Sequence, residues 1–159
     1  MATRPRRAPR RPRTAGATLE RLILDTTILI AAERSSAAIE QVVADEDDVV
    51  IAAITAAELL AGVELADRRH KRPRRTFVNS LLATIPIEPY DLQVARVHAE
   101  LLAHTRTTGR PRGAHDLLIA ATARAHTRTV VTADIAGFSG LAGVAVRQLP
   151  QTAAPSAAG

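Results

Sequence analysis

The sequence predicts an α/β fold built on a parallel sheet. Short apolar runs alternate with segments whose apolar residues recur at helical spacing, which is the pattern of βαβ units. The chain has 159 residues, 47% of them hydrophobic, so one domain with a sizeable core is expected. Aromatic residues are only 2% of the chain, which predicts an aliphatic core and disfavours nucleic-acid readers that use aromatic stacking platforms.

The predicted strands are the apolar runs at 22–25, 49–52, 85–87, 129–132 and 144–146. The predicted helices lie at 28–33, from Ser35 to about 45, from Thr55 onward, at 74–84, from Asp91 to about 105, and from 113 to about 125. Ser35 and Asp91 are residue types that favour the N-cap of a helix. Residues 109–113 are predicted to be a loop, and the chain shows no internal repeat.

The formal net charge of +5 is unevenly distributed. Residues 1–17 hold six arginines and no acid, so the remaining chain has 15 basic and 16 acidic residues. This proline-containing stretch is predicted to be a disordered arm, which either attracts RNA through its phosphates or is an inert extension. A second basic cluster at 68–75 is either an RNA-binding surface or a solvated helix face or loop.

We therefore expect three parts: the arm at 1–17, a folded domain at 18–150, and a flexible tail at 151–159. The chain lacks cysteine, which excludes disulfides and thiolate metal sites. No run reaches the ~18 apolar residues of a membrane span, and Glu20, Arg21 and Asp25 interrupt what would be the apolar part of a signal peptide. These features predict a cytoplasmic protein without membrane association.

Four acidic residues, Asp25, Glu58, Asp116 and Asp134, each lie at the edge of an apolar segment. A carboxylate beside a core segment is costly unless a partner or a metal compensates it. In a parallel sheet, ligands bind beyond the carboxyl ends of the strands, near the topological switch point. The four residues could therefore converge on one rim and form an acidic metal site.

Each acid also has a structural alternative. Asp25 could cap a helix, and Glu58 could complete a capping box with Thr55. Asp116 has the position of an acid in the first turn of a helix, and Asp134 could start a turn. Helix and turn chemistry explain Asp25 and Asp116 least well, so these two residues carry most of the functional interpretation.

Three neighbouring residues are candidate partners of the acids. Thr27 could hold the Asp25 carboxylate or contact a metal-bound water, and the hydroxyl of Thr132 could serve Asp134. His115 either contacts substrate or is a bystander. Carboxylates are the ligands that Mg²⁺ and Mn²⁺ prefer, and one or two such ions can activate a water for phosphodiester cleavage. Zinc-ligand spacings, a Walker A loop and a GxGxxG loop are absent from the sequence.

The chain resembles the PIN domain family and, within it, the VapC-type toxins of bacterial toxin–antitoxin pairs. The resemblance covers about residues 20–149 and rests on four motifs in order: LDTT at 24–27, TAAEL at 55–59, DLLIAATA at 116–123 and VTADIAGF at 131–138. It implies a parallel five-stranded sheet flanked by helices. It also implies a Mg²⁺- or Mn²⁺-dependent ribonuclease whose metal ligands correspond to Asp25, Glu58, Asp116 and Asp134.

The resemblance further implies an RNA substrate, a homodimer and a small cognate antitoxin. Many members of the family carry Asn at the position of Asp134, and the arginine-rich arm lies outside the family pattern. On this basis the predicted function is that of a metal-dependent endoribonuclease, the toxin of a type II toxin–antitoxin pair.

Three alternatives remain open on the sequence alone. A housekeeping PIN-domain RNA-processing nuclease would have the same fold and site. A non-catalytic RNA-binding module would use the basic arm and the cluster at 68–75. A phosphatase of the haloacid-dehalogenase type also places Asp at a strand end, but it needs an acid where this chain has Thr27, and Lys71 is the single lysine available.

Overall fold

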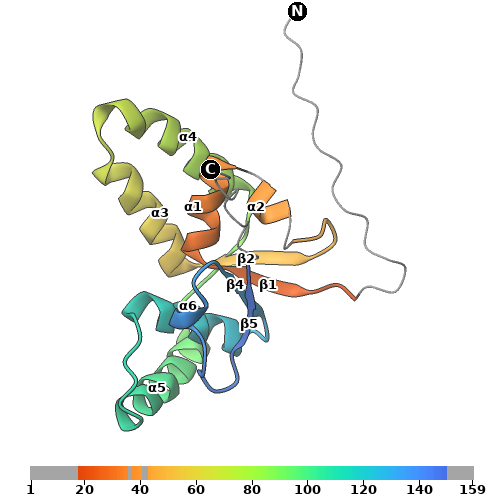
Figure 1. Ribbon diagram of the computed structural model, residues 1–159, viewed down its shortest axis with the longest axis vertical. Coiled ribbons are helices and arrows are strands. Elements are labelled where there is room, and N and C mark those ends of the chain that lie inside the picture. The colour runs from red at the N-terminus through yellow and green to blue at the C-terminus, as the bar shows by residue number, and fades with distance from the viewer. Residues whose placement is uncertain (1–17, 36, 41–42, 150–159) are drawn as a thin grey trace, which may run out of the picture.

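The computed structural model describes residues 18–35, 37–40 and 43–149, so the predicted arm at 1–17 and tail at 151–159 lie outside the described residues. Five parallel strands form one sheet in the order β3-β2-β1-β4-β5, with helices on both faces (Figure 1). This architecture confirms the predicted fold class. The order reverses beside β1, so the topological switch point lies between β1 and β4.

The strands are β1 (Arg21–Leu24), β2 (Asp48–Ala52), β3 (Ile87–Glu88), β4 (Thr129–Thr132) and β5 (Ala145–Gln148). In the central register, Ile23 of β1 pairs with Val50 of β2 and with Val130 of β4. β1 is apolar at each position after Arg21 because helices cover both faces of the sheet there. The predicted strand at 85–87 is instead the two-residue β3, because Ile85 caps the preceding helix.

The helices are α1 (Thr26–Arg34), α2 (Ala37–Glu40), α3 (Ala53–Leu65), α4 (Arg68–Thr84), α5 (Leu92–Thr107), α6 (Ala114–Ala125) and the 3₁₀ helix η1 (Ile135–Gly137). Aspartates begin three of the α-helices: Asp25, Asp67 and Asp91 accept backbone N–H bonds at the starts of α1, α4 and α5. Ser35, predicted to begin a helix, is the C-cap of α1.

Helix α4 begins six residues before the predicted start at 74. The prediction excluded Pro73, which lacks the N–H that a helix interior uses. The structure tolerates it because Asp67 caps the helix by accepting from His70 N at 2.9 Å, and because Val78 and Leu81 anchor the far half in the core. The basic cluster at 68–75 therefore lies on a helix.

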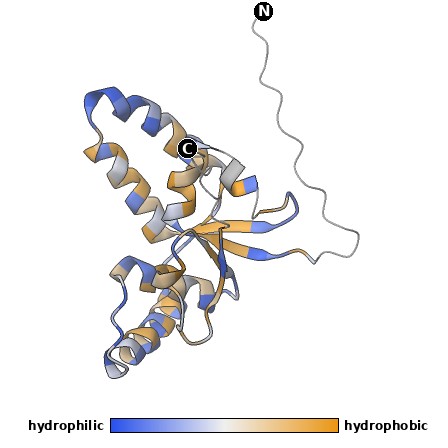
Figure 2. Ribbon diagram, viewed as in Figure 1, coloured by the Kyte–Doolittle hydropathy of each residue, from blue (hydrophilic) through white to orange (hydrophobic). Residues whose placement is uncertain are grey.

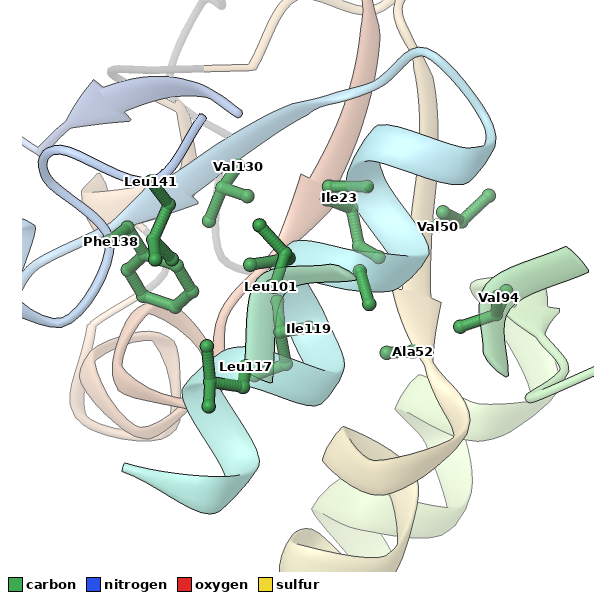
Figure 3. Close-up of a cluster of buried hydrophobic side chains, with 13 residues drawn as sticks. Ile23, Val50, Ala52, Val94, Leu101, Leu117, Ile119, Val130, Phe138 and Leu141 are labelled. Atoms are coloured by element: carbon green, nitrogen blue, oxygen red, sulfur yellow. The ribbon is translucent and has the colours of Figure 1, made fainter. Parts of the chain in front are cut away.

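The core has two layers, one on each face of the sheet. Leu22 and Leu24 point to the face covered by α1, α3 and α4, whereas Ile23 points to the face covered by α5 and α6. Figure 3 shows the second layer, in which Phe138 and Leu141, just after η1, pack against Val130. Alternate β1 side chains thus enter opposite layers.

Hydropathy follows this layering (Figure 2). Apolar residues concentrate on the strands and on the helix surfaces that face them, while the tip of the α3–α4 hairpin is hydrophilic. Among the residues that the structure describes, no helix combines the length and the apolar character needed to cross a bilayer.

Candidate active site

Asp25 lies at the carboxyl end of the central strand and is the N-cap of α1. It is only 4% exposed, and its carboxylate accepts three hydrogen bonds. The donors are Thr26 N at 2.7 Å, Thr27 Oγ1 at 2.7 Å and Thr132 Oγ1 at 2.8 Å. The cap expected as a structural alternative is therefore present, yet the two hydroxyls orient the carboxylate beyond what a cap requires.

The two predicted threonines connect the ends of neighbouring strands. Thr132 ends β4; its Oγ1 donates to Asp25 and accepts from the backbone N–H of Asp134 at 2.9 Å. Thr27 also accepts from Ala133 N at 3.1 Å while donating to Asp25. These bonds hold β1 and β4 together at the switch point and fix the Asp25 carboxylate.

Glu58 extends toward the same region from the second turn of α3. Thr26 Oγ1 donates to its Oε1 at 3.2 Å, and His115 Nδ1 lies 3.4 Å from the same oxygen. The capping-box alternative is wrong: α3 starts at Ala53, so Thr55 is inside the helix, buried, with no partner for its hydroxyl among the described residues. β2 runs directly into α3, which leaves no loop in which Thr55 could act as a cap.

Asp116 lies in the first turn of α6, between two glycines. A Cβ atom at Gly113 would lie 2.9 Å from Asp116 Oδ2, and one at Gly137 would lie 2.7 Å from it. Both distances are shorter than side chains tolerate, so the carboxylate occupies space that only glycine leaves open at these positions. Backbone from η1 therefore packs directly on this acid.

The pKa of Asp116 is affected by the three other acids of the predicted site. Burial raises the pKa of Asp116 above its ordinary value, and the negative charges of Asp25, Asp134 and Glu58, in that order, raise it further. The imidazole of His115 acts in the opposite direction. Residues far apart in the sequence thus share one region of negative potential at the rim of the sheet.

Asp134 is the most exposed of the four. It follows β4 and caps η1 by accepting from Ala136 N at 3.1 Å, so the turn that the sequence suggested as an alternative is present. Its carboxylate nevertheless lies near enough to Asp116 to affect the pKa of that residue. One oxygen of Asp134 is committed to the cap, and the other has no partner within the described part of the chain.

The donor set fits Mg²⁺ or Mn²⁺. As the side chains lie, no three of the described acidic or histidine residues enclose a position suited to a metal ion. The fit rests instead on chemistry: the donors are carboxylate oxygens, which these hard cations prefer. Burial and then repulsion from the neighbouring carboxylates raise the pKa of Asp116, and a nearby divalent cation would offset that repulsion.

A family model for the PIN domain matches residues 22–143. The chain belongs to the PIN domain family. It is 29% identical over 126 residues to "Ribonuclease VapC1" of Rickettsia felis, covering 79% of this chain and 93% of that protein. It is 36% identical over 91 residues to "Toxin FitB" of Neisseria gonorrhoeae, covering 55% of this chain and 66% of that protein.

Solved structures share the fold. FitAcB from Neisseria gonorrhoeae is 32% identical, with 79% of this chain and 95% of that chain covered at a TM-score of 0.64. VapBC2 from Rickettsia felis, bound to a promoter DNA fragment, reaches a TM-score of 0.74 at 24% identity, covering 82% and 99%. VapBC-5 from Mycobacterium tuberculosis is 30% identical, covering 80% and 98%, at a TM-score of 0.66.

Sequence reasoning missed two features of this PIN domain site. Gly113 and Gly137 were not predicted to matter, although their lack of a side chain admits the Asp116 carboxylate. His115 was left open between substrate contact and bystander, and the structure places it beside Glu58. Glycines close to the DLLIAATA and VTADIAGF motifs were the available signal, but it requires knowing that the two motifs meet in space.

Proposed function

We propose that this PIN domain protein is a Mg²⁺- or Mn²⁺-dependent endoribonuclease and the toxin of a type II toxin–antitoxin pair. The observation that carries the proposal is the convergence of Asp25, Glu58, Asp116 and Asp134 at the switch point, with a raised pKa for Asp116. Relatives named ribonuclease and toxin support the same activity.

Each side chain has a distinct role in this proposal. Asp25 is the fixed ligand, because three hydrogen bonds orient it before any ion arrives. Asp116 and Glu58 supply further negative charge, and His115 beside Glu58 orients that carboxylate or balances its charge. Asp134, the most exposed of the four acids, supplies a further carboxylate oxygen. When bound, the ion supplies Lewis-acid activation of water and stabilises charge on the phosphodiester.

Partners follow from the same family relationship. Neighbouring structures are VapBC and FitAB assemblies, one of them described as a toxin–antitoxin complex from Klebsiella pneumoniae. We infer that this chain likewise binds a small antitoxin protein, acts on RNA in the cytoplasm and assembles as a homodimer. The arginine-rich arm at 1–17 would add nonspecific attraction to RNA.

The nuclease activity is tested with purified protein, structured RNA and Mg²⁺. Asp25→Asn and Asp116→Asn should each lower the cleavage rate by about 100-fold or more, since each removes a charged ligand. Glu100→Gln is the matched control, because Glu100 is an exposed acid on α5 that pairs with Arg124. Undiminished cleavage by both site variants would contradict the assigned site.

The toxin assignment needs a separate measurement. Induced expression of the wild-type chain should arrest growth of a bacterial host, and Asp116→Asn should not. Co-expression of a small protein encoded beside the gene should restore growth and copurify with the chain. RNA cleavage in vitro without growth arrest would support a housekeeping nuclease and contradict the toxin.

A further inference from the structure

Unpaired positive charge lies beside the acidic site, in a part of the chain that the sequence had assigned only as a loop. Residues 101–115 contain no acid but hold three arginines and two histidines. Arg110 and Arg112 lie between α5 and α6 (Figure 1, lower left), and neither forms an ion pair with any described residue. These two cations are therefore available to an external anion.

The basic cluster at 68–75, which the sequence singled out, is paired in part within the fold. Lys71 lies 3.0 Å from Glu64, and Arg75 pairs with the same carboxylate. Arg74 pairs with Glu33 across the α1–α4 contact. Arg68, Arg69 and Arg72 of this cluster form no ion pair with any described residue either. The cations near α6 are the stronger candidate because they line a pocket that adjoins Asp116.

A pocket of about 410 Å³ opens at these cations, and it is lined in part by His104, Thr108, Arg110 and Arg112. The Arg112 guanidinium is held in place because its Nη2 donates to the carbonyl of Ser139 at 2.7 Å. Its Nε is buried and has no partner among the described residues. That buried Nε cannot reach a ligand in the pocket, so binding would use the outer guanidinium nitrogens. A guanidinium held in place beside a second arginine is suited to an oxyanion.

The pocket adjoins the acidic site through the segment at 137–140. At one end, a Cβ at Gly137 would meet the Asp116 carboxylate at 2.7 Å. At the other end, a Cβ at Gly140 would lie 3.9 Å from Nη2 of Arg112. A Cβ at Gly113, which follows Arg112 directly, would lie 2.9 Å from Oδ2 of Asp116. The cationic pocket therefore lies next to Asp116 of the acidic rim.

We propose that this pocket binds a backbone phosphate of the RNA, next to the phosphodiester that is cleaved. The inference rests on the proposed function, since a strand positioned for cleavage at the acidic rim must place its next phosphate within a nucleotide of that rim. Arg110 and Arg112 attract the strand that the four carboxylates repel, and the fixed guanidinium of Arg112 sets its register. The pocket is large enough for a phosphate with its ribose.

Binding of fluorescent single-stranded RNA, measured in EDTA over a range of salt concentrations, tests this proposal without any cleavage. Arg110→Ala and Arg112→Lys should each weaken binding, on the order of tenfold for Arg110→Ala. The slope of log K against log salt should fall by about 0.7 for Arg110→Ala, the value for one phosphate contact to a single strand. Arg96→Ala on α5 is the control, because it removes one exposed positive charge away from the pocket and should leave the slope unchanged.

In Mg²⁺, Arg110→Ala should raise KM for RNA with kcat nearly unchanged. If both pocket variants bind RNA with wild-type affinity and wild-type salt dependence, the proposal that the pocket binds a phosphate is overturned. The nuclease proposal would still stand, since cleavage by the wild-type protein is measured separately. Inorganic phosphate and an acidic peptide serve as competing ligands. If Arg110→Ala weakens binding of either one but not of RNA, the pocket takes a free anion or a protein, and the proposal is overturned.

Discussion

Two buried or partly buried charge clusters in this molecule have opposite electrostatic character. Arg128, just before β4, is 7% exposed and contacts Asp48 and Glu88 at 3.1 and 3.0 Å. Hydrogen bonding to Arg128 is the leading reason that the pKa of Asp48 lies below its ordinary value. At the rim of the sheet, by contrast, burial and neighbouring carboxylates raise the pKa of Asp116.

The difference shows where the fold balances its charges and where it does not. Charge around Arg128 is neutralised by acids from β2 and β3, so this cluster fastens strands together. Charge around Asp116 is left unbalanced, which costs stability, and the proposed divalent cation would offset it. Four substitutions test this contrast.

The largest effect on stability is expected for Arg128→Met. Removal of the guanidinium leaves Glu88 and Asp48 without their shared cation and should lower the free energy of unfolding by about 3 kcal/mol. Urea denaturation measures the change. Arg21→Met is the control, because the Arg21–Asp48 pair is about half exposed and should contribute below about 1 kcal/mol. Equal losses in the two variants would contradict a special role for the buried cluster.

Gly137→Ala should affect activity more than stability. The new methyl group would lie 2.7 Å from Asp116 Oδ2, so that carboxylate must move and its alignment in the site is lost. The resulting displacement of the Asp116 carboxylate should reduce RNA cleavage by about 100-fold, with a small change in Tm. Gly62→Ala on α3 has open space around its new methyl group and should retain activity while matching or exceeding wild-type stability. Full activity of Gly137→Ala would show that the position of Asp116 is unimportant.

Thr132→Val removes the hydroxyl that donates to Asp25 at 2.8 Å and accepts from the backbone of Asp134. A buried carboxylate that loses a donor should cost about 1.5–2 kcal/mol of folding stability, and cleavage should fall with it. Thr132→Ser keeps the hydroxyl and should restore most of both. Thermal unfolding and cleavage of the two variants provide the comparison, and identical behaviour would argue against an orienting role for the hydroxyl.

Asp116→Asn, which should abolish most of the cleavage, should give the smallest change in folding stability, and in the stabilising direction. Because the pKa of Asp116 is raised in the folded protein, ionisation of this group opposes folding, so stability is lost as pH rises from about 3.9 through the raised value. The variant should therefore melt a few °C higher than wild type in EDTA at neutral pH, and the difference should vanish below about pH 3.9. Lower stability of the variant at neutral pH would show that Asp116 is favourably partnered. The paired Asp48, whose pKa is lowered, has the opposite sign: its contribution is present at neutral pH and lost on acidification.

Prediction from sequence succeeded where local patterns decide the structure. The run at 22–24 is apolar without interruption, and Asp91 precedes an apolar helical repeat, so both elements were located closely. Prediction failed at the start of α4. There the cap by Asp67 and the packing of the far half of the helix outweigh the cost of Pro73 in the helix. It also offered a capping box at Thr55 that the direct passage from β2 into α3 excludes.

The strands, most of the helices and the acids that could form a site were predictable from the sequence, because these depend on residues within a few positions of one another. Tertiary structure decided which groups meet. Thr132 holds Asp25 from 107 residues away, and Glu88 meets Arg128 from 40 residues away. Whether a carboxylate is neutralised or left with its charge depends on distances through space, and only the folded chain sets those distances.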